Sequence, residues 1–151
     1  MNNKARLTMY ILTSGLFLLL DQLLKYFARL NPDYTYYLWK PWLGWEYFAN
    51  TGIAFSLPIP NWLVVFSTPF ILLALILWLI KTYKKSFANC YLLSAICLII
   101  AGALSNYLDR VMFGVTIDYL RILTSIINLA DVMIVLGVLL LIIKNKNKYG
   151  Q

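Results

Sequence analysis

The chain contains no histidine, which removes one of the commonest general bases and metal ligands in proteins. It has only two cysteines, Cys90 and Cys97, seven residues apart in one apolar segment. On a helix that spacing is a rise of about 10 Å, which is too far for a disulfide. We therefore interpret both cysteines as small apolar residues. Zinc sites draw mainly on cysteine and histidine, so the sequence predicts no metal site and no metal cofactor.

Charged residues are also scarce. They make up 13% of the 151 residues, against roughly 25% in a soluble protein, and 62% of the residues are hydrophobic. This composition predicts an all-α integral membrane protein with one domain over residues 1–151. A helix needs about 20 apolar residues to cross a bilayer. Four segments meet that length, at about 7–27, 62–80, 86–108 and 126–143.

The net charge of +7 comes from bases at the ends of the apolar segments, a placement that argues against a nucleic-acid partner. Eight bases fall on one side of the predicted bundle: Lys4, Arg6, Lys81, Lys84, Lys85, Lys144, Lys146 and Lys148. The positive-inside rule then predicts a multi-pass protein of the cytoplasmic membrane with both termini cytoplasmic. Segments 30–61 and 109–125 face outward. The basic start also resembles a signal peptide, but the apolar run is too long and no A-x-A-like site follows.

The first outward segment, 30–61, is rich in tyrosine and tryptophan. Alternation in Tyr34–Trp39 and Trp45–Phe48 predicts short strands. Aromatic side chains often sit at the headgroup level of a membrane. The segment is therefore either an aromatic belt or a small β-sheet that lies on the outer membrane surface and helps to form a binding surface.

Polar residues gather near the outer ends of the predicted helices. Asp21 lies about 21 Å along the first helix from residue 7, and Lys25 follows it at i+4, so we expect a structural ion pair. Ionisable groups in a membrane are costly and by default suggest function. The others at this depth are Asn106, Asp109, Arg110, Asp118, Asn128 and Asp131.

Asp118 and Asp131 are the two carboxylates best placed for chemistry. Neighbouring carboxylates in a low dielectric share a proton, so that one activates water and the other donates to a carbonyl, as in aspartic proteases. The alternative is structural, with Asp118 capping a turn and Asp131 capping the fourth helix. Spacing alone does not decide between them.

Two other classes of membrane protein also place polar groups in a bilayer. A proton-coupled transporter would need acidic residues along the whole path, whereas the second and third predicted helices carry no charge. A noncatalytic assembly subunit would use its polar groups to hold helices together. That subunit would tolerate conservative Asp→Asn changes.

Five blocks occur in the order of one known family, the lipoprotein signal peptidases (signal peptidase II). The chain resembles D-x-x-x-K at 21–25, N-x-G-x-A-F-S at 50–56, G-A-x-x-N-x-x-D-R at 102–110, G-x-V-x-D-[FY] at 114–119 and N-x-A-D at 128–131. Each block is weak alone, and five in order are specific. Ser105 is a departure, since family members often have glycine there.

The resemblance implies an intramembrane aspartic endopeptidase that removes the signal peptide from prolipoproteins, just before a cysteine that carries diacylglycerol. It implies that Asp118 and Asp131 are catalytic and that Asp21, Lys25 and Asp109 are structural. Five further positions would line the substrate site: Asn50, Gly52, Asn106, Arg110 and Asn128. The implied partners are the diacylated prolipoprotein and membrane lipid, with no cofactor. The implied location is the bacterial inner membrane, with the active site at the outer leaflet, and we expect a monomer.

Overall fold

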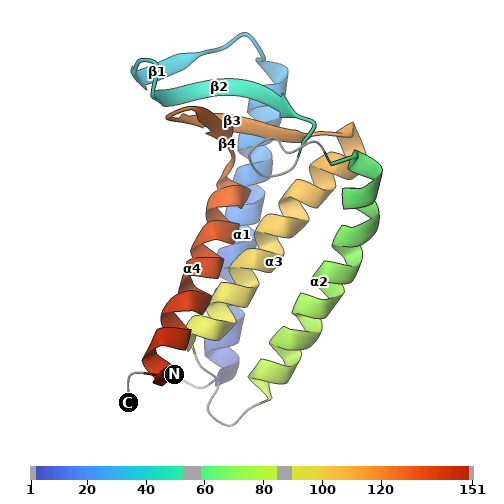
Figure 1. Cartoon of the computed structure of the whole chain (residues 1–151), viewed down its shortest axis with the longest axis vertical. Helices are drawn as coiled ribbons and strands as arrows, with labels where there is room; N and C mark the ends of the chain where they lie inside the picture. Colours follow the sequence, from blue (N-terminus) through green and yellow to red (C-terminus); the bar gives the residue numbers. More distant parts are fainter. Residues whose placement is uncertain (1–2, 53–58, 85–89, 150–151) are drawn as a thin grey trace.

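The computed structural model describes residues 3–52, 59–84 and 90–149, with side chains as far as residue 143. Four helices support a small sheet at one end of the molecule (Figure 1). The elements are α1 (Asn3–Leu30), β1 (Tyr36–Trp39), β2 (Leu43–Asn50), α2 (Asn61–Tyr83), α3 (Cys90–Phe113), β3 (Thr116–Ile122), β4 (Ser125–Ile127) and α4 (Leu129–Tyr149). Helix α1 begins, and α4 ends, at the end of the bundle opposite the sheet.

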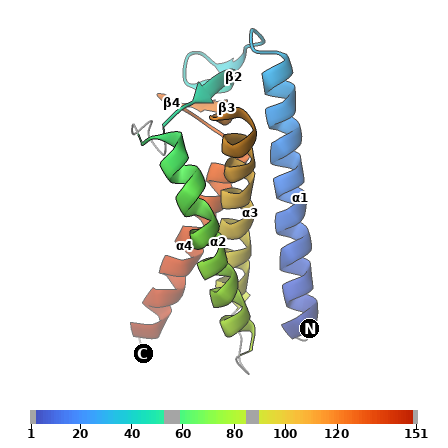
Figure 2. The ribbon, with the colours of Figure 1, turned by 90° about the vertical axis from the view of Figure 1, so that its right-hand side faces the viewer.

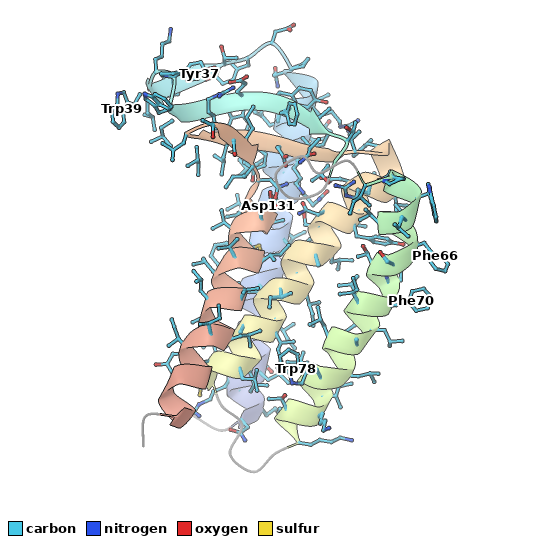
Figure 3. All side chains as sticks on the ribbon, viewed as in Figure 1. Tyr37, Trp39, Phe66, Phe70, Trp78 and Asp131 are labelled. Atoms are coloured by element: carbon cyan, nitrogen blue, oxygen red, sulfur yellow. The ribbon has the colours of Figure 1, made fainter. Side chains whose placement is uncertain are left out.

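Helices run through all four predicted apolar segments. By length and composition α1, α2 and α3 are able to cross a membrane, and the apolar part of α4, Leu129–Ile143, is shorter. In α2 only Thr82 is buried, and Phe66 and Phe70 project outward from it (Figure 3). Such a surface suits contact with lipid rather than water. Residues 86–89, the predicted start of the third segment, lie outside the described residues.

Helix α3 is the centre of the bundle and packs against each of the other three helices (Figure 2). Two glycines bring α3 and α4 together. A Cβ on Gly102 would lie 2.6 Å from the Ala130 carbonyl oxygen, and one on Gly137 would lie 2.5 Å from Cγ1 of Ile99. Only glycine permits this close approach, so the spacing of α3 and α4 is fixed at two levels.

The sheet is antiparallel, with strand order β1-β2-β3-β4. Strands β1 and β2 confirm the two predicted from aromatic alternation, so the segment forms a sheet and not only a belt. Strands β3 and β4 were not predicted. As a result, residues 126–127, assigned by the sequence to the fourth helical segment, pair with β3 instead, and α4 begins at Leu129.

The sheet is attached to the bundle through a small apolar core. Ala28 of α1 packs with Ile117 and Tyr119 of β3, and Trp45 of β2 covers them. The rings of Trp45 and Tyr119 lie 4.9 Å apart. This core holds the end of α1 nearest the sheet against β3, the strand that carries Asp118, and a short turn joins β3 to α3.

Candidate active site

Asp118 lies on β3, where the sheet meets the helices, opposite Phe48 of β2. It is 1% exposed and accepts two side-chain hydrogen bonds. Asn50 Nδ2 donates to Oδ2 at 2.9 Å, and Asn128 Nδ2 donates to Oδ1 at 2.6 Å. Asn50 ends β2 and Asn128 precedes α4, so the carboxyl is held from both sides.

Asp131 lies in the first turn of α4, beneath the sheet (Figure 3). Its backbone N–H donates to Asn128 Oδ1 at 2.9 Å, and the Asn128 N–H donates to Asp131 Oδ2 at 3.3 Å. This reciprocal pair is a capping box, with Asn128 at the N-cap and Asp131 three residues later. Asn106 Nδ2 of α3 donates to the remaining oxygen, Oδ1, at 2.9 Å.

Asn128 therefore connects the two aspartates. Its side-chain nitrogen binds Asp118, and its side-chain oxygen and backbone nitrogen bind Asp131. Asn128 is fully buried, so breaking its bond to either aspartate would leave a buried polar group without a hydrogen-bond partner. The pair Asp118 and Asp131, called the aspartate pair below, is thus positioned by one amide shared between a strand and a helix.

The protonation of Asp118 reflects this environment. The pKa of Asp118 is raised from 3.8 to about 7, first by burial and then by repulsion from Asp131. The hydrogen bonds from Asn50 and Asn128 act against both effects, because they favour the ionised carboxylate. A carboxyl with a pKa near neutrality readily gains or loses a proton at physiological pH, as acid–base catalysis requires.

Gly52 and Arg110 form a support beside the aspartate pair. Gly52 N–H donates to Asn50 Oδ1 at 3.0 Å, which orients the amide that binds Asp118. Arg110 of α3 donates from Nη2 to the Gly52 carbonyl oxygen and from Nη1 to Asn61 Oδ1 at 3.3 Å. Arg110 thus uses one of its several N–H donors to hold a backbone carbonyl oxygen. Residues 53–56 of the N-x-G-x-A-F-S block lie outside the described residues.

Asp21, Lys25 and Asp109 form a second group, called the ion-pair cluster below. Lys25 Nζ lies 2.9 Å from Asp21 and 2.8 Å from Asp109, and all three side chains are buried. The predicted pairing of Asp21 with Lys25 is present, and Asp109 is a third member. Asp109 also accepts the Ile117 N–H at 3.1 Å, which ties the cluster to β3.

Several residues that support these groups were given no role from the sequence. Ser105 donates to Asp21 at 2.6 Å and accepts from Gln22 at 2.8 Å, so the departure from glycine adds both of these hydrogen bonds. Tyr119 donates to Asp21 at 2.8 Å and accepts the Leu129 N–H at 3.1 Å. Asn61 binds Arg110. Gln22, Ser105 and Tyr119 lie within the family's sequence blocks. Their polar side chains at those positions were the signal that could have predicted a supporting role.

The ten predicted site residues therefore fall into two adjoining groups. One surrounds the aspartate pair: Asn50, Gly52, Asn106, Arg110, Asp118, Asn128 and Asp131. The other is the ion-pair cluster. Lys25 joins them, because its Nζ also donates to Asn106 Oδ1 at 2.8 Å. The described geometry leaves none of the ten isolated.

Comparison with known proteins places this arrangement in a family. Residues 13–146 match the family described as Signal peptidase (SPase) II. The lipoprotein signal peptidase of Thermodesulfovibrio yellowstonii is 37% identical over 142 residues, which cover 88% of this chain and 91% of that protein. The lipoprotein signal peptidase of Bartonella henselae is 37% identical over 145 residues, covering 89% and 83%.

A solved structure agrees with the fold. A bacterial membrane enzyme determined by the in meso method at 2.3 Å resolution superposes with a TM-score of 0.85 at 26% identity. The match covers 95% of this chain and 90% of that one. With the profile match and the relatives over most of its length, the chain belongs to the signal peptidase II family.

Proposed function

We propose that the protein is an intramembrane aspartic endopeptidase that removes the signal peptide from diacylglyceryl-modified prolipoproteins, cutting just before the lipidated cysteine. Membership of the signal peptidase II family supports a protease of a bacterial membrane that acts on lipoprotein signal peptides. The observation that carries the aspartic mechanism is the Asn128 bridge, which binds Asp118 and caps the turn that holds Asp131.

In this mechanism one aspartate is ionised and takes a proton from water, while the other is protonated and donates to the scissile carbonyl oxygen. A pKa of about 7 for Asp118 fits a group that must both hold and release a proton. Asn50, Gly52, Asn106, Arg110 and Asn128 form the surroundings of the scissile bond. The two carboxyls and water suffice, so the reaction needs no cofactor.

The same proposal places the molecule in the bacterial inner membrane as four spans with both termini cytoplasmic. In this placement α4 is the fourth span, and its apolar part, Leu129–Ile143, rises about 22 Å, which is most of the thickness of the hydrocarbon core. The sheet then lies on the outer surface, where Leu38 and Trp39 of β1 are 71% and 68% exposed (Figure 3). The aspartate pair, beneath the sheet, is at the depth where a lipid-anchored substrate presents its scissile bond.

The test is cleavage of a purified diacylated prolipoprotein, read on a gel. We expect Asp118→Asn and Asp131→Asn each to lower the rate by at least about a thousandfold, because neither amide can transfer the proton. Asp33→Asn is the matched control, since Asp33 is exposed and outside both polar groups. A chelator should leave the wild-type rate unchanged.

Three outcomes would contradict this function. Wild-type product from either Asn variant, with the protein folded and inserted, would favour the noncatalytic assembly subunit. Strong inhibition by the chelator would require a metal-dependent reaction in place of the aspartate pair. Proton uptake by vesicles without cleavage would instead favour the transporter.

A further inference from the structure

The Asn106 amide is held at both ends. Lys25 Nζ donates to its oxygen at 2.8 Å, and its nitrogen donates to Asp131 Oδ1 at 2.9 Å. An ammonium group has donors only, so it faces the amide oxygen and never the amide nitrogen. Lys25 therefore determines which end of Asn106 is presented to Asp131, although no described contact joins Lys25 to either aspartate of the pair.

Lys25 is itself firmly placed. Its side chain is 2% exposed and lies between the carboxylates of Asp21 and Asp109. The charges of these three side chains sum to −1 when all are ionised. A buried cation with two carboxylate partners needs no third one for its own stability. Beyond these ion pairs Lys25 donates to Ser105 Oγ at 3.4 Å and to Asn106 Oδ1 at 2.8 Å, and the bond to Asn106 connects it to the aspartate pair.

The surroundings of the two aspartates differ. Each accepts two N–H groups, but Asp131 also lies in the first turn of α4, where the helix dipole favours negative charge. Asp118 lies on a strand and lacks that contribution. The charged and titratable groups around Asp131 are Asp21 and Lys25 from α1, Asp109 and Arg110 from α3, and Asp118 and Tyr119 from β3.

We propose that Lys25 is a positioning residue: through Asn106 it keeps Asp131 ionised as the general base and leaves the shared proton on Asp118. This inference rests on the proposed function. Asp131 takes a proton from water as the water oxygen bonds to the carbonyl carbon, and Asp118 gives its proton to the carbonyl oxygen. As the C–N bond breaks, Asp131 passes its proton to the leaving nitrogen. Asp118 recovers one from the diol as the carbonyl re-forms.

The experiment measures kcat/KM against pH. The fall in kcat/KM at low pH, the acid limb of the profile, reports protonation of the general base. In Asn106→Ala, which leaves the ion-pair cluster intact, we expect the acid limb to move up by about one pH unit. The double variant Asp21→Asn with Lys25→Met keeps the net charge of the cluster at −1 and should move the limb by a similar amount. Asp21→Asn alone keeps Lys25 and is the matched control: because it removes a negative charge that faces Asp131, its acid limb should stay or move down, and not up.

A combined variant tests whether Lys25 acts through Asn106. When Asp21→Asn and Lys25→Met are added to Asn106→Ala, the acid limb should move no further. Additive movement would overturn the proposal, because Lys25 would then act on Asp131 directly. If the acid limb does not move in Asn106→Ala, that result by itself overturns the proposal, whether or not the Lys25 variants fold. Inactive Asp118→Asn and Asp131→Asn variants would leave the proposed function standing in either case.

Discussion

At the scale of single residues, Asn128 shows that capping α4 and joining the two aspartates are not alternatives in this chain. The N-x-A-D spacing is that of an N-cap residue and the third residue of its helix, so helix geometry fixes the distance between them. The same asparagine has one side-chain group left, its Nδ2, and this group binds Asp118. A residue needed to start α4 thus also fixes Asp118 relative to Asp131.

Stability should depend on pH through Asp118. Its pKa is raised in the folded protein, mainly by burial, so its contribution to stability is full below about pH 4 and is lost as pH rises through about 7. The rise from 3.8 to about 7 corresponds to at most about 4 kcal/mol. Asp118→Asn removes this titration. We expect the Tm of the variant minus that of wild type to increase between pH 4 and pH 8.

The control for this measurement is Asp33→Asn, because Asp33 is exposed. Its Tm difference from wild type should stay flat over the same pH range. A flat difference for Asp118→Asn as well would mean that Asp118 titrates near its ordinary value and is not the buried acid described above.

At the scale of elements, the position of Asp131 depends on how closely α4 approaches α3. Gly137 lies where a Cβ would be 2.5 Å from Ile99 Cγ1 and 2.9 Å from the Ala95 carbonyl oxygen. The second contact is backbone and does not yield to a change of rotamer. Asp131 is on the same helix as Gly137 and is held by Asn106 of α3, so a wider spacing stretches that hydrogen bond.

Gly137→Ala should therefore lower both stability and activity. We expect a loss of about 1–3 kcal/mol from overpacking, measured as a lower Tm, together with slower cleavage. Gly15→Ala is the matched control, because nothing lies within 4 Å of a Cβ at that position of α1. It should be neutral or slightly stabilising, since alanine favours a helix more than glycine does. Equal effects of the two changes would contradict the close packing of α3 and α4.

The sequence predicted these elements unevenly, for a physical reason. The helices follow from long apolar runs, and β1 and β2 from aromatic alternation, which are both local patterns. Strand β3 forms because Thr116–Ile122 pairs with β2, about 70 residues earlier in the chain, and β4 then pairs with β3. That pairing brings Asn50 to Asp118. The motif predicted that the two residues share a site, but no local pattern predicted their hydrogen bond.

At the scale of the whole molecule, apolar surface and polar site are separated. The helices expose large apolar side chains, whereas the aspartate pair and the ion-pair cluster adjoin each other through Lys25 and Asn106, next to β3. The sequence predicted this common depth from helix rise. It did not predict that Lys25 would join the two groups, because a contact between α1 and α3 depends on tertiary packing.

This arrangement predicts dependence on the substrate's lipid. In the proposed function, acyl chains in the bilayer would hold the scissile bond at the depth of the aspartate pair, which would lower the entropy cost of positioning before the chemical step. We expect an unlipidated precursor to be cut at least about tenfold more slowly at equal concentration. The same precursor with and without diacylglycerol forms the matched pair. Equal rates would remove lipid recognition from the proposed function.

The orientation of the bundle predicts which ends of the helices are accessible from outside. Lys40 lies in the β1–β2 connection and Lys4 at the start of α1, at opposite ends of the molecule. In a background with Cys90→Ser and Cys97→Ala, a membrane-impermeant maleimide should label Lys40→Cys in intact spheroplasts. It should label Lys4→Cys only after the membrane is permeabilised, because the proposed orientation places that basic end in the cytoplasm. The reverse pattern would place the aspartate pair at the inner leaflet, where it would not meet a substrate exported to the outer face.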